Sequence, residues 1–382
     1  MRRSLGIDLG TTNSVAACSA QVLPLVDGEA RSTLMPSVVA LLPSGGAIVG
    51  AEARQRRAID PRNTIYASKR LMGESWTSYA TRQFREQYPH ELVPSPDGGV
   101  QFDTRAGRIR PVEVASLIVS HLCMRSAVAP DDVATVVAVP TSFREPARRA
   151  TLEAMGHAGF ADVKVIQEPV ATAIAYLQRA SLRYAAVYDF GGGTFDFAVI
   201  DCTNFPFRVL GNEGNPYLGG DDIDRALAEM VCQQVLRTAG WDLRSEPVTF
   251  ARLVLACEDA KCALSEHERQ RLDITAIDPA APPSLKEAFI DREMLAAAAT
   301  PLIRRTFSHC DAVLSQAGLR AREVQAVFLA GGSSRLTLLQ SMVSEYFGRK
   351  LRTDLNPEHV VALGASIAAA RPELWPLLDA KT

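Results

Sequence analysis

The sequence has little net charge and no long apolar run. Its 41 basic residues nearly cancel 43 acidic ones, which leaves a formal net charge of −2. A chain without excess positive charge gives no electrostatic reason to expect nucleic acid or an anionic membrane as a partner. Apolar stretches such as 133–140 are far shorter than the roughly 20 residues that span a bilayer. We therefore expect no nucleic-acid partner and no membrane partner.

Cysteine is sparse and irregularly spaced. The chain has seven cysteines, and Cys257 and Cys262 lie five positions apart, which fits neither a zinc site nor a disulfide framework. The start of the chain is basic, but Asp8 interrupts the following apolar stretch, unlike a secretory signal. These features predict a protein of a reducing compartment, with a cytoplasmic location, that uses its thiols as small apolar side chains.

Several catalytic motifs are absent. The sequence contains no G-x-x-x-x-G-K-[ST] loop, no H-E-x-x-H pair, no G-x-S-x-G elbow and no S-x-x-K motif. Walker-type nucleotide binding, metalloprotease, serine hydrolase and β-lactamase chemistry therefore lack support. Lysine is scarce, because only six of the 41 basic residues are lysines. Two of these six, Lys69 and Lys261, are among the candidate site residues given below.

The sequence does have an ordinary globular composition, with 47% hydrophobic and 22% charged residues, and a length that suggests about two domains. Short buried strands alternate with amphipathic helices, which predicts α/β layers. The expected strands are 134–139, 163–166 and 324–329, and the expected helices are 145–156, 168–178, 221–238, 249–264 and 336–347.

Two segments resemble each other and lie about half a chain apart. Residues 5–16 and 186–198 each read as an apolar strand, an Asp, a glycine-rich turn with Thr, and a second apolar strand. Each pattern predicts a β-hairpin, and the pair suggests an internal duplication of one fold unit. The turn-rich region 38–111 looks like an insertion in the first half, and the region 219–296 looks like its counterpart in the second.

The two hairpins suggest a phosphate site. A tight glycine turn exposes backbone N–H groups that can cradle phosphate oxygens. Asp8 and Asp189 precede these turns, and a carboxylate there would repel phosphate unless a cation intervenes. A hydrated Mg²⁺ touched by both carboxylates through water resolves the conflict. One hairpin alone is more simply a solvated turn, whereas a facing pair favours the phosphate interpretation.

Together these segments resemble the nucleotide-binding domain of Hsp70 (DnaK-type) chaperones, within the actin/hexokinase/Hsp70 superfamily. The resemblance is carried by five further segments beside 6–14 and 189–196, in the family's order and over essentially the whole chain: 139–148, 167–176, 329–335, 356–358 and 362–365. It implies a duplicated actin-like (ribonuclease H-like) α/β fold, with two lobes of two subdomains each around a central nucleotide cleft.

The resemblance also implies domain boundaries. Lobe I would comprise residues 1–184, with a core of 1–37 and 112–184 and the inserted subdomain 38–111. Lobe II would comprise residues 185–370, with a core of 185–218 and 297–355 and the inserted subdomain 219–296. Residues 356–370 would pack back on lobe I, and 371–382 would form a tail or linker.

Functional roles follow from the same resemblance, with ATP or ADP, Mg²⁺ and K⁺ as the implied ligands. The catalytic residues would be Lys69, Glu168, Thr194 and Asp196, and Mg²⁺ would be held through water by Asp8 and Asp189. The nucleotide would be bound by Gly10, Thr11, Thr12, Asn13, Gly191, Gly192, Gly193, Thr194, Glu258, Lys261, Ser265, Gly331, Gly332, Ser333, Arg335 and Glu358.

The adenosine half departs from the family pattern in places. Glu258, Lys261 and Ser265 are spaced to share one helix face, although on spacing alone a solvated Glu–Lys pair is the simpler interpretation. Some relatives have an Arg after this lysine that stacks on adenine, and here Cys262 takes that position. Loss of that stacking predicts weaker nucleotide binding. Glu358 stands where the family has an Asp.

The predicted function is therefore a slow MgATP hydrolase of the Hsp70 chaperone type. A J-domain co-chaperone and a nucleotide exchange factor are the expected partners, and clients would bind only through a substrate-binding domain outside this chain. The chain is either an excised domain or a natural short Hsp70-like protein. A small-molecule kinase and an actin-like filament ATPase share the superfamily cradle and are the alternatives.

Overall fold

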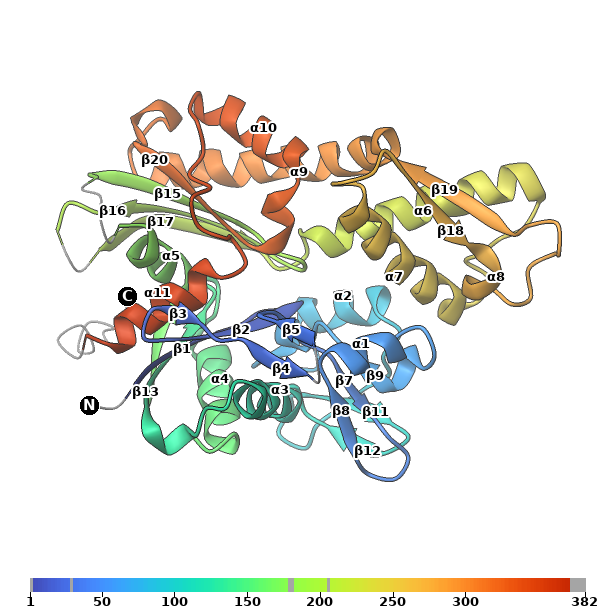
Figure 1. Cartoon of the computed structure of the whole chain (residues 1–382), viewed down its shortest axis with the longest axis horizontal. Coiled ribbons are helices and arrows are strands. Elements are labelled where there is room, and N and C mark those ends of the chain that lie inside the picture. The colour runs from blue at the N-terminus through green and yellow to red at the C-terminus, as the bar shows by residue number, and fades with distance from the viewer. Residues whose placement is uncertain (1–2, 28–29, 178–181, 205–206, 372–382) are drawn as a thin grey trace.

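The computed structural model describes residues 3–27, 30–177, 182–204 and 207–371. They form two α/β halves, which are coloured blue to green and light green to red in Figure 1. The α/β prediction is therefore confirmed. The predicted tail lies outside the described residues except for Arg371.

The first sheet has the strand order β14-β13-β1-β2-β3, with β6 paired to β2. Strand β1 runs parallel to β13 and antiparallel to β2, so the predicted first hairpin is confirmed. The central strands are buried along nearly their whole length, which explains their continuous apolar runs. The strands are β1 (Arg3–Leu9), β2 (Asn13–Cys18), β3 (Gln21–Val22), β6 (Met35–Pro36), β13 (Val133–Val139) and β14 (Val163–Gln167).

The second sheet has the order β17-β16-β15-β20. Strand β15 is antiparallel to β16 and parallel to β20, so the second predicted hairpin is also confirmed. The strand predicted at 324–329 begins two residues later and ends one residue later. The strands are β15 (Tyr184–Phe190), β16 (Phe195–Asp201), β17 (Arg208–Asn215) and β20 (Ala326–Ala330).

The two sheets place Asp8 and Asp189 in equivalent positions. Each is the last residue but one of its strand, and each strand lies between its antiparallel hairpin partner and a parallel strand. Asp8 pairs with Val15 and Ala138, whereas Asp189 pairs with Asp196 and Ala330. This shared topology supports the duplication that the sequence predicts.

Two helices lie between the sheets, and others cover the outer faces. Helices α5 and α11 pack against each other, and their shared apolar cluster includes residues of both sheets. In Figure 1, α11 (red) comes from the end of the chain and lies beside β1. Helices α3 and α4 pack together beside the first sheet, and α9 and α10 beside the second. The helices are α3 (Pro111–Arg125), α4 (Glu145–His157), α5 (Glu168–Tyr176), α9 (Arg292–Gln316), α10 (Thr337–Phe347) and α11 (Val360–Ala369).

Two glycines allow α11 to approach its neighbours. A Cβ at Gly6 of β1 would lie 2.1 Å from the Ser366 backbone nitrogen, and a Cβ at Gly364 would lie 1.8 Å from the Ala171 carbonyl oxygen of α5. Backbone atoms cannot rotate out of the way as a side chain can. These contacts therefore require glycine at both positions.

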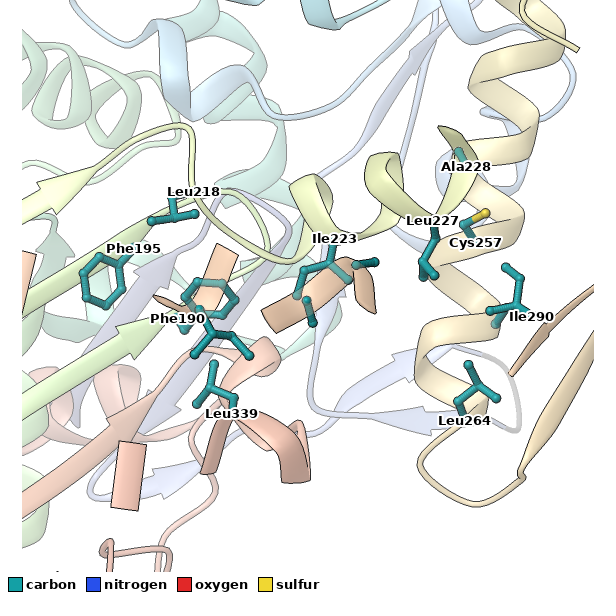
Figure 2. Packing of buried hydrophobic residues seen from close by; sticks show 14 of the residues in the cluster. Phe190, Phe195, Leu218, Ile223, Leu227, Ala228, Cys257, Leu264, Ile290 and Leu339 are labelled. Atoms are coloured by element: carbon teal, nitrogen blue, oxygen red, sulfur yellow. The ribbon is translucent and has the colours of Figure 1, made fainter. Parts of the chain in front are cut away.

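The region 219–296 is mainly helical. It contains α6 (Gly220–Ala239), α7 (Pro247–Ala263), α8 (Ile274–Ile277) and the hairpin of β18 (Arg269–Asp273) and β19 (Glu287–Asp291). Figure 2 shows its core continuing into that of the second sheet. Leu227 and Cys257 lie at one end of this core and Phe190 and Phe195 at the other.

The region 38–111 is mainly made of short strands. Its two small sheets have the orders β8-β7-β9 and β10-β11-β12. The strands are β7 (Val39–Leu41), β8 (Ala47–Val49), β9 (Thr64–Ile65), β10 (Leu92–Pro94), β11 (Val100–Thr104) and β12 (Gly107–Ile109). The helices are α1 (Ala51–Arg56), η1 (Pro61–Asn63), η2 (Ser68–Leu71) and α2 (Tyr79–Gln87). Elsewhere lie β4 (Leu25–Asp27), β5 (Ala30–Ser32), η3 (Pro130–Asp132), η5 (Ala321–Glu323) and η6 (Gly332–Arg335).

A buried histidine lies among the aromatic rings of region 38–111. His90 is 5% exposed, and its ring centre lies 4.8 Å from that of Tyr66 and 5.6 Å from that of Phe102. Burial, and then the charge of Arg57, lower the pKa of His90 to about 3. The imidazole is therefore neutral in the folded chain at neutral pH.

From the lowered pKa of His90 we predict that the folded chain loses stability in mild acid. Below the unfolded pKa of about 6.5 the unfolded chain binds a proton that folded His90 does not, so the free energy of unfolding falls as pH drops towards 3. The contribution approaches about 1.4 kcal/mol per pH unit. Urea unfolding of wild type and His90→Phe at pH 7, 6 and 5 measures it. Equal pH slopes for the two proteins would contradict it.

Among the described residues, no helix is both long and apolar enough to cross a membrane.

Candidate functional site

A cavity of about 760 Å³ lies between the two halves of the chain. Its walls contain all the site residues that the sequence predicts except Gly193 and Asp196. Residues as distant in sequence as Asp8 and Glu358 therefore meet around one space. That space is the candidate functional site.

The first glycine turn (Gly10–Asn13) connects β1 to β2 at the cavity wall. A Cβ at Gly10 would lie 2.1 Å from the Asn13 carbonyl oxygen, so the tight turn requires glycine there. Ser37 fixes the turn from outside, because its hydroxyl donates to the Gly10 carbonyl oxygen (2.8 Å) and its N–H to that of Thr12 (2.8 Å).

The second glycine turn (Gly191–Thr194) connects β15 to β16. A hydrogen bond within the turn closes it, because the Gly191 N–H donates to the Thr194 carbonyl oxygen at 2.9 Å. The first turn of α6 also binds it: the Gly220 N–H donates to the Gly191 carbonyl oxygen (3.0 Å), and the Asp221 N–H to that of Gly192 (2.6 Å). The start of α6 thereby satisfies N–H groups that have no partner within the helix.

The two turns touch each other across the cavity. A Cβ at Gly192 would lie 1.9 Å from the Thr12 hydroxyl oxygen, and a Cβ at Gly193 would lie 2.6 Å from a methyl carbon of Thr11. The glycines of the second turn are therefore needed for close approach of the two halves. The facing pair that the phosphate interpretation requires is present.

Four acidic groups, two of them buried and two half-buried, gather beside the turns. Asp8, Asp189, Asp196 and Glu168 interact electrostatically, and the last two are 5% and 6% exposed. Burial, then repulsion by Glu168, raise the pKa of Asp8 to about 7, with a partial offset from Lys69. The same two causes raise the pKa values of Asp189 and Asp196 well above the usual range. The cluster thus has more acid groups than its cation can neutralise.

Lys69 is the cation in this cluster. Its Nζ lies 2.8 Å from Glu168 Oε1, and the two side chains are 10% and 8% exposed. Burial opposes the lysine charge, but Glu168 and Asp8 outweigh it and raise its pKa, so Lys69 stays protonated. The preceding Ala67 has φ of 55°, in the left-handed region that disfavours alanine, as the chain turns into η2.

Among the described residues, no three acidic, histidine or cysteine side chains are grouped to hold a metal ion by themselves, so a divalent cation here would need water and phosphate as further ligands. Four carboxyl groups face a single ammonium group, and burial together with repulsion by Glu168 disfavours the charges of Asp8, Asp189 and Asp196. A divalent ion would relieve that repulsion and could also bind oxygens of a triphosphate lying on the glycine turns. Asp8 and Asp189 line the cavity, whereas Asp196 lies behind its wall with Thr141 Oγ1 3.5 Å from its Oδ1.

The other end of the cavity contains a second buried lysine. Lys261 of α7 is 8% exposed, and its Nζ donates to Asp224 Oδ2 (2.7 Å) and to the Gly220 carbonyl oxygen (3.1 Å). The solvated Glu–Lys pair considered from spacing is thus not what the structure contains. A Cβ at Gly220 would lie 2.2 Å from the Ser333 hydroxyl oxygen and 2.9 Å from Lys261 Nζ, so these groups converge.

One expectation about this end of the cavity is wrong. Helix α7 ends at Ala263, so Ser265 does not continue the helical face of Glu258 and Lys261. Its hydroxyl donates to the Cys262 carbonyl oxygen at 2.5 Å, as happens where a chain leaves a helix and the last carbonyls lack partners. Ser265 and Cys262 nevertheless both line the cavity.

Glu258 makes ion pairs between the two inserted regions. Arg54 of α1 and Arg57, which follows it, place guanidinium nitrogens 3.1 and 3.0 Å from its carboxylate. Burial alone would raise the pKa of Glu258, but the two arginines outweigh it and lower the pKa. Arg54 also lies 2.7 Å from Asp259. This cluster, which connects the two inserted regions, was not expected from sequence.

The remaining wall comes from β20, η6 and the start of α11. Gly331 has φ of 81°, and a Cβ there would lie 2.5 Å from Asp189 Oδ1. The Glu358 carboxylate packs against Gly332, where a Cβ would lie 2.9 Å from Oε1, and it accepts a hydrogen bond from Arg335 at 2.8 Å. Apolar side chains from these and neighbouring elements complete the lining, as in many small-molecule sites. They are Leu264, Leu295, Ala299, Leu336 and Leu338.

Three residues of the site region escaped the sequence analysis. They are Arg70, Asp221 and Asp224. Arg70 directly follows Lys69, and the segment Gly219-Gly220-Asp221-Asp222 is a glycine pair before acidic residues at a helix start, which could have been recognised as a third turn. The side chains of Arg70 and Asp224 hydrogen-bond to residues 123 and 37 positions away along the chain, so no local pattern shows what these two side chains contact.

Comparisons with known proteins agree with this geometry. The Hsp70 protein family matches residues 4–371. The chaperone protein HscA of Edwardsiella ictaluri is 37% identical over 96% of this chain and 58% of its own length. HscA homologues of Burkholderia lata and Bordetella pertussis are 38% and 36% identical, over 99% and 98% of this chain. The chain spans 61% and 60% of those two proteins, or about three fifths of each relative.

The matched range contains both glycine turns, Lys69, Glu168 and all the residues that line the cavity. The chain therefore belongs to the Hsp70 family and has its α/β, actin-like ATPase fold.

Proposed function

We propose that this chain is an Hsp70-type ATPase module that binds MgATP between its lobes, hydrolyses it slowly and changes lobe orientation with the nucleotide state. The observation that carries the proposal is the contact of two glycine turns from opposite halves beside the buried Lys69–Glu168 pair. A triphosphate on both turns would connect the lobes. Loss of its last phosphate would remove part of that connection.

The chain's own residues supply position and charge for hydrolysis. Lys69 can stabilise the charge that develops on the γ-phosphate, and Glu168 or Asp196 can orient the attacking water and accept its proton. Thr194 can donate its hydroxyl from the second turn. Bound Mg²⁺, associated with Asp8 and Asp189 through water, would neutralise phosphate charge. K⁺ remains a prediction from the resemblance.

The nucleoside would occupy the other end of the cavity. Lys261, held by Asp224, has one remaining N–H for a ribose oxygen, since two of its three donors have partners. The apolar wall would contact the base, and Arg335 with Glu358 would close its outer side. Cys262 supplies only a small contact there, which supports the expected weakening of base stacking.

A direct test combines binding and turnover. We expect calorimetry to detect one MgATP per chain with binding lost in excess EDTA, and phosphate to be released slowly with water as acceptor. Transfer to an added sugar would instead favour a kinase, and ATP-dependent sedimentation would favour a filament protein. Absence of heat with MgATP would reject the proposal.

From the ion pairs between the two inserted regions we predict that they slow nucleotide release. Arg54→Gln removes two ion pairs between the inserted regions, each of partly exposed type worth about 0.2–1 kcal/mol. Release of a fluorescent ADP should therefore accelerate by about 2- to 30-fold in stopped-flow, with a weaker dependence on salt. Arg56→Gln, on the same helix and without an ion pair among the described residues, is the control. An unchanged release rate in Arg54→Gln would contradict this role.

Chaperone partners are part of the same proposal. A J-domain co-chaperone and a nucleotide exchange factor would act on this module in the cytoplasm, and a separate substrate-binding domain would hold the client. The lobe boundaries given above, including the insertions 38–111 and 219–296, are likewise proposed. The matched relatives are chaperones by name and extend beyond the length of this chain.

A further inference from the structure

Two consecutive cations of η2 point to different halves of the molecule. Lys69 pairs with Glu168 and lines the cavity, whereas Arg70 donates to the carbonyl oxygen of Gly193 in the second glycine turn (2.5 Å). The Arg70 side chain is 1% exposed and does not line the cavity. It therefore cannot contact the nucleotide, and any influence on the reaction passes through the turn.

Arg70 is enclosed by groups from both halves. Its guanidinium carbon lies 5.4 Å from the ring centre of Tyr88 and 4.8 Å from that of Tyr217, and its Nη2 lies 3.6 Å from Asp221 Oδ2. Tyr217 itself crosses to α2, where its hydroxyl donates to the Ala80 carbonyl oxygen (2.5 Å). Closure of the lobes thus builds the environment of this cation.

The second turn is shaped to receive this arginine. A Cβ at Gly193 would lie 2.8 Å from Arg70 Nη2 and 3.0 Å from its Nε. Any other residue at position 193 would push the guanidinium away from the carbonyl. Glycine at this position therefore serves the contact with Arg70, together with the contact to Thr11, in addition to the flexibility of the turn.

The environment of Arg70 leaves two of its nitrogens unsatisfied. Nε and Nη1 are buried and have no hydrogen-bond partner among the described residues. A buried donor without a partner lowers stability, so such a group needs another reason to be there. An apolar side chain of similar length would avoid that cost, and simple packing does not explain the arginine.

We propose that Arg70 is a positioning residue for hydrolysis, a role that rests on the proposed ATPase function. By fixing the Gly193 carbonyl to lobe I when the lobes close, it places the second glycine turn and Thr194 opposite Lys69. The two adjacent cations of η2 then have separate roles. Lys69 acts on the phosphate, and Arg70 positions the turn that binds the phosphate. A small displacement of such a turn lowers the rate of a reaction that depends on alignment.

The test compares Arg70→Met with wild type in two independent measurements. Hydrogen exchange of the free protein should be faster in the peptide 188–196 of the variant, whatever its activity. Steady-state kinetics should show kcat reduced about tenfold or more with KM within about threefold, while Tm is unchanged or raised. Arg70→Lys, which keeps a donor, should recover part of kcat. Arg82→Met on the exposed side of α2 is the control.

The outcomes separate this inference from the proposed function. Unchanged exchange in 188–196 would overturn the contact between Arg70 and the turn in solution. Faster exchange with unchanged kcat, or a fall in kcat that only follows a fall in Tm, would overturn the positioning role. A wild-type chain without hydrolysis would overturn the proposed function together with this catalytic role. The exchange measurement would still decide whether Arg70 holds the turn.

Discussion

Replacing Lys69 by alanine should reduce ATP hydrolysis by about 10²–10³-fold while MgATP still binds within a fewfold of wild type. The Lys69 charge acts mainly in the transition state, where negative charge moves within the transferred phosphoryl group. Binding depends instead on both glycine turns and on the Lys261 end of the cavity. Single-turnover phosphate release gives the rate, and calorimetry gives the affinity.

The control for this prediction is Lys286→Ala, which removes an exposed lysine far along the chain. Lys69→Ala also leaves Glu168 buried without its 2.8 Å partner, so a thermal melt must accompany the kinetics. A parallel loss of affinity and rate would mean that Lys69 holds the ground state. An unchanged rate would show that Lys69 has no role in hydrolysis.

Replacing Gly364 by alanine should lower the free energy of unfolding by about 3 kcal/mol, the upper part of the usual range for overpacking. The added methyl group would lie 1.8 Å from the Ala171 carbonyl oxygen and 2.4 Å from its carbon. Helices α5 and α11 would have to separate, and the core that they share with both sheets would loosen. Denaturant unfolding monitored by circular dichroism measures the effect.

Gly156→Ala is the matched control. Gly156 also lies in a helix, α4, but it is exposed, and a Cβ at this position would have no neighbouring atom within 4 Å. Alanine should therefore stabilise the chain there by about 0.5–1 kcal/mol through helix propensity. If both substitutions shifted stability in the same direction, the close approach of α11 to α5 would not be the deciding factor.

Local patterns predicted the elements of the fold well. Both hairpins, the strands at 134–139 and 163–166 and the helices at 145–156 and 336–347 are present within two residues of their expected ends. The expected helix at 168–178 ends at Tyr176, and Gln178 lies outside the described residues. Periodicity and turn residues determine such elements because they act over a few neighbouring positions.

The candidate site was predicted less evenly. The glycine turns with Asp8 and Asp189 could be recognised because strand, acid and turn are contiguous in sequence. Lys69 needed the family resemblance, since nothing local distinguishes it from a surface lysine. The failure at Ser265 has a local cause: helical spacing cannot show that α7 ends at Ala263.

The sequence by itself determined that this is an α/β chain with two equivalent hairpins, each bringing an acid and a glycine turn to the end of a buried strand. Only the tertiary structure decided what these turns face. Lys69 hydrogen-bonds to Glu168, which lies 99 positions away in the sequence, and Arg70 hydrogen-bonds to Gly193, which lies 123 positions away. The balance of burial and charge that fixes such pairs arises only in the folded chain, within one half for Lys69 and Glu168 and between the halves for Arg70 and Gly193, so it leaves no periodicity in the sequence.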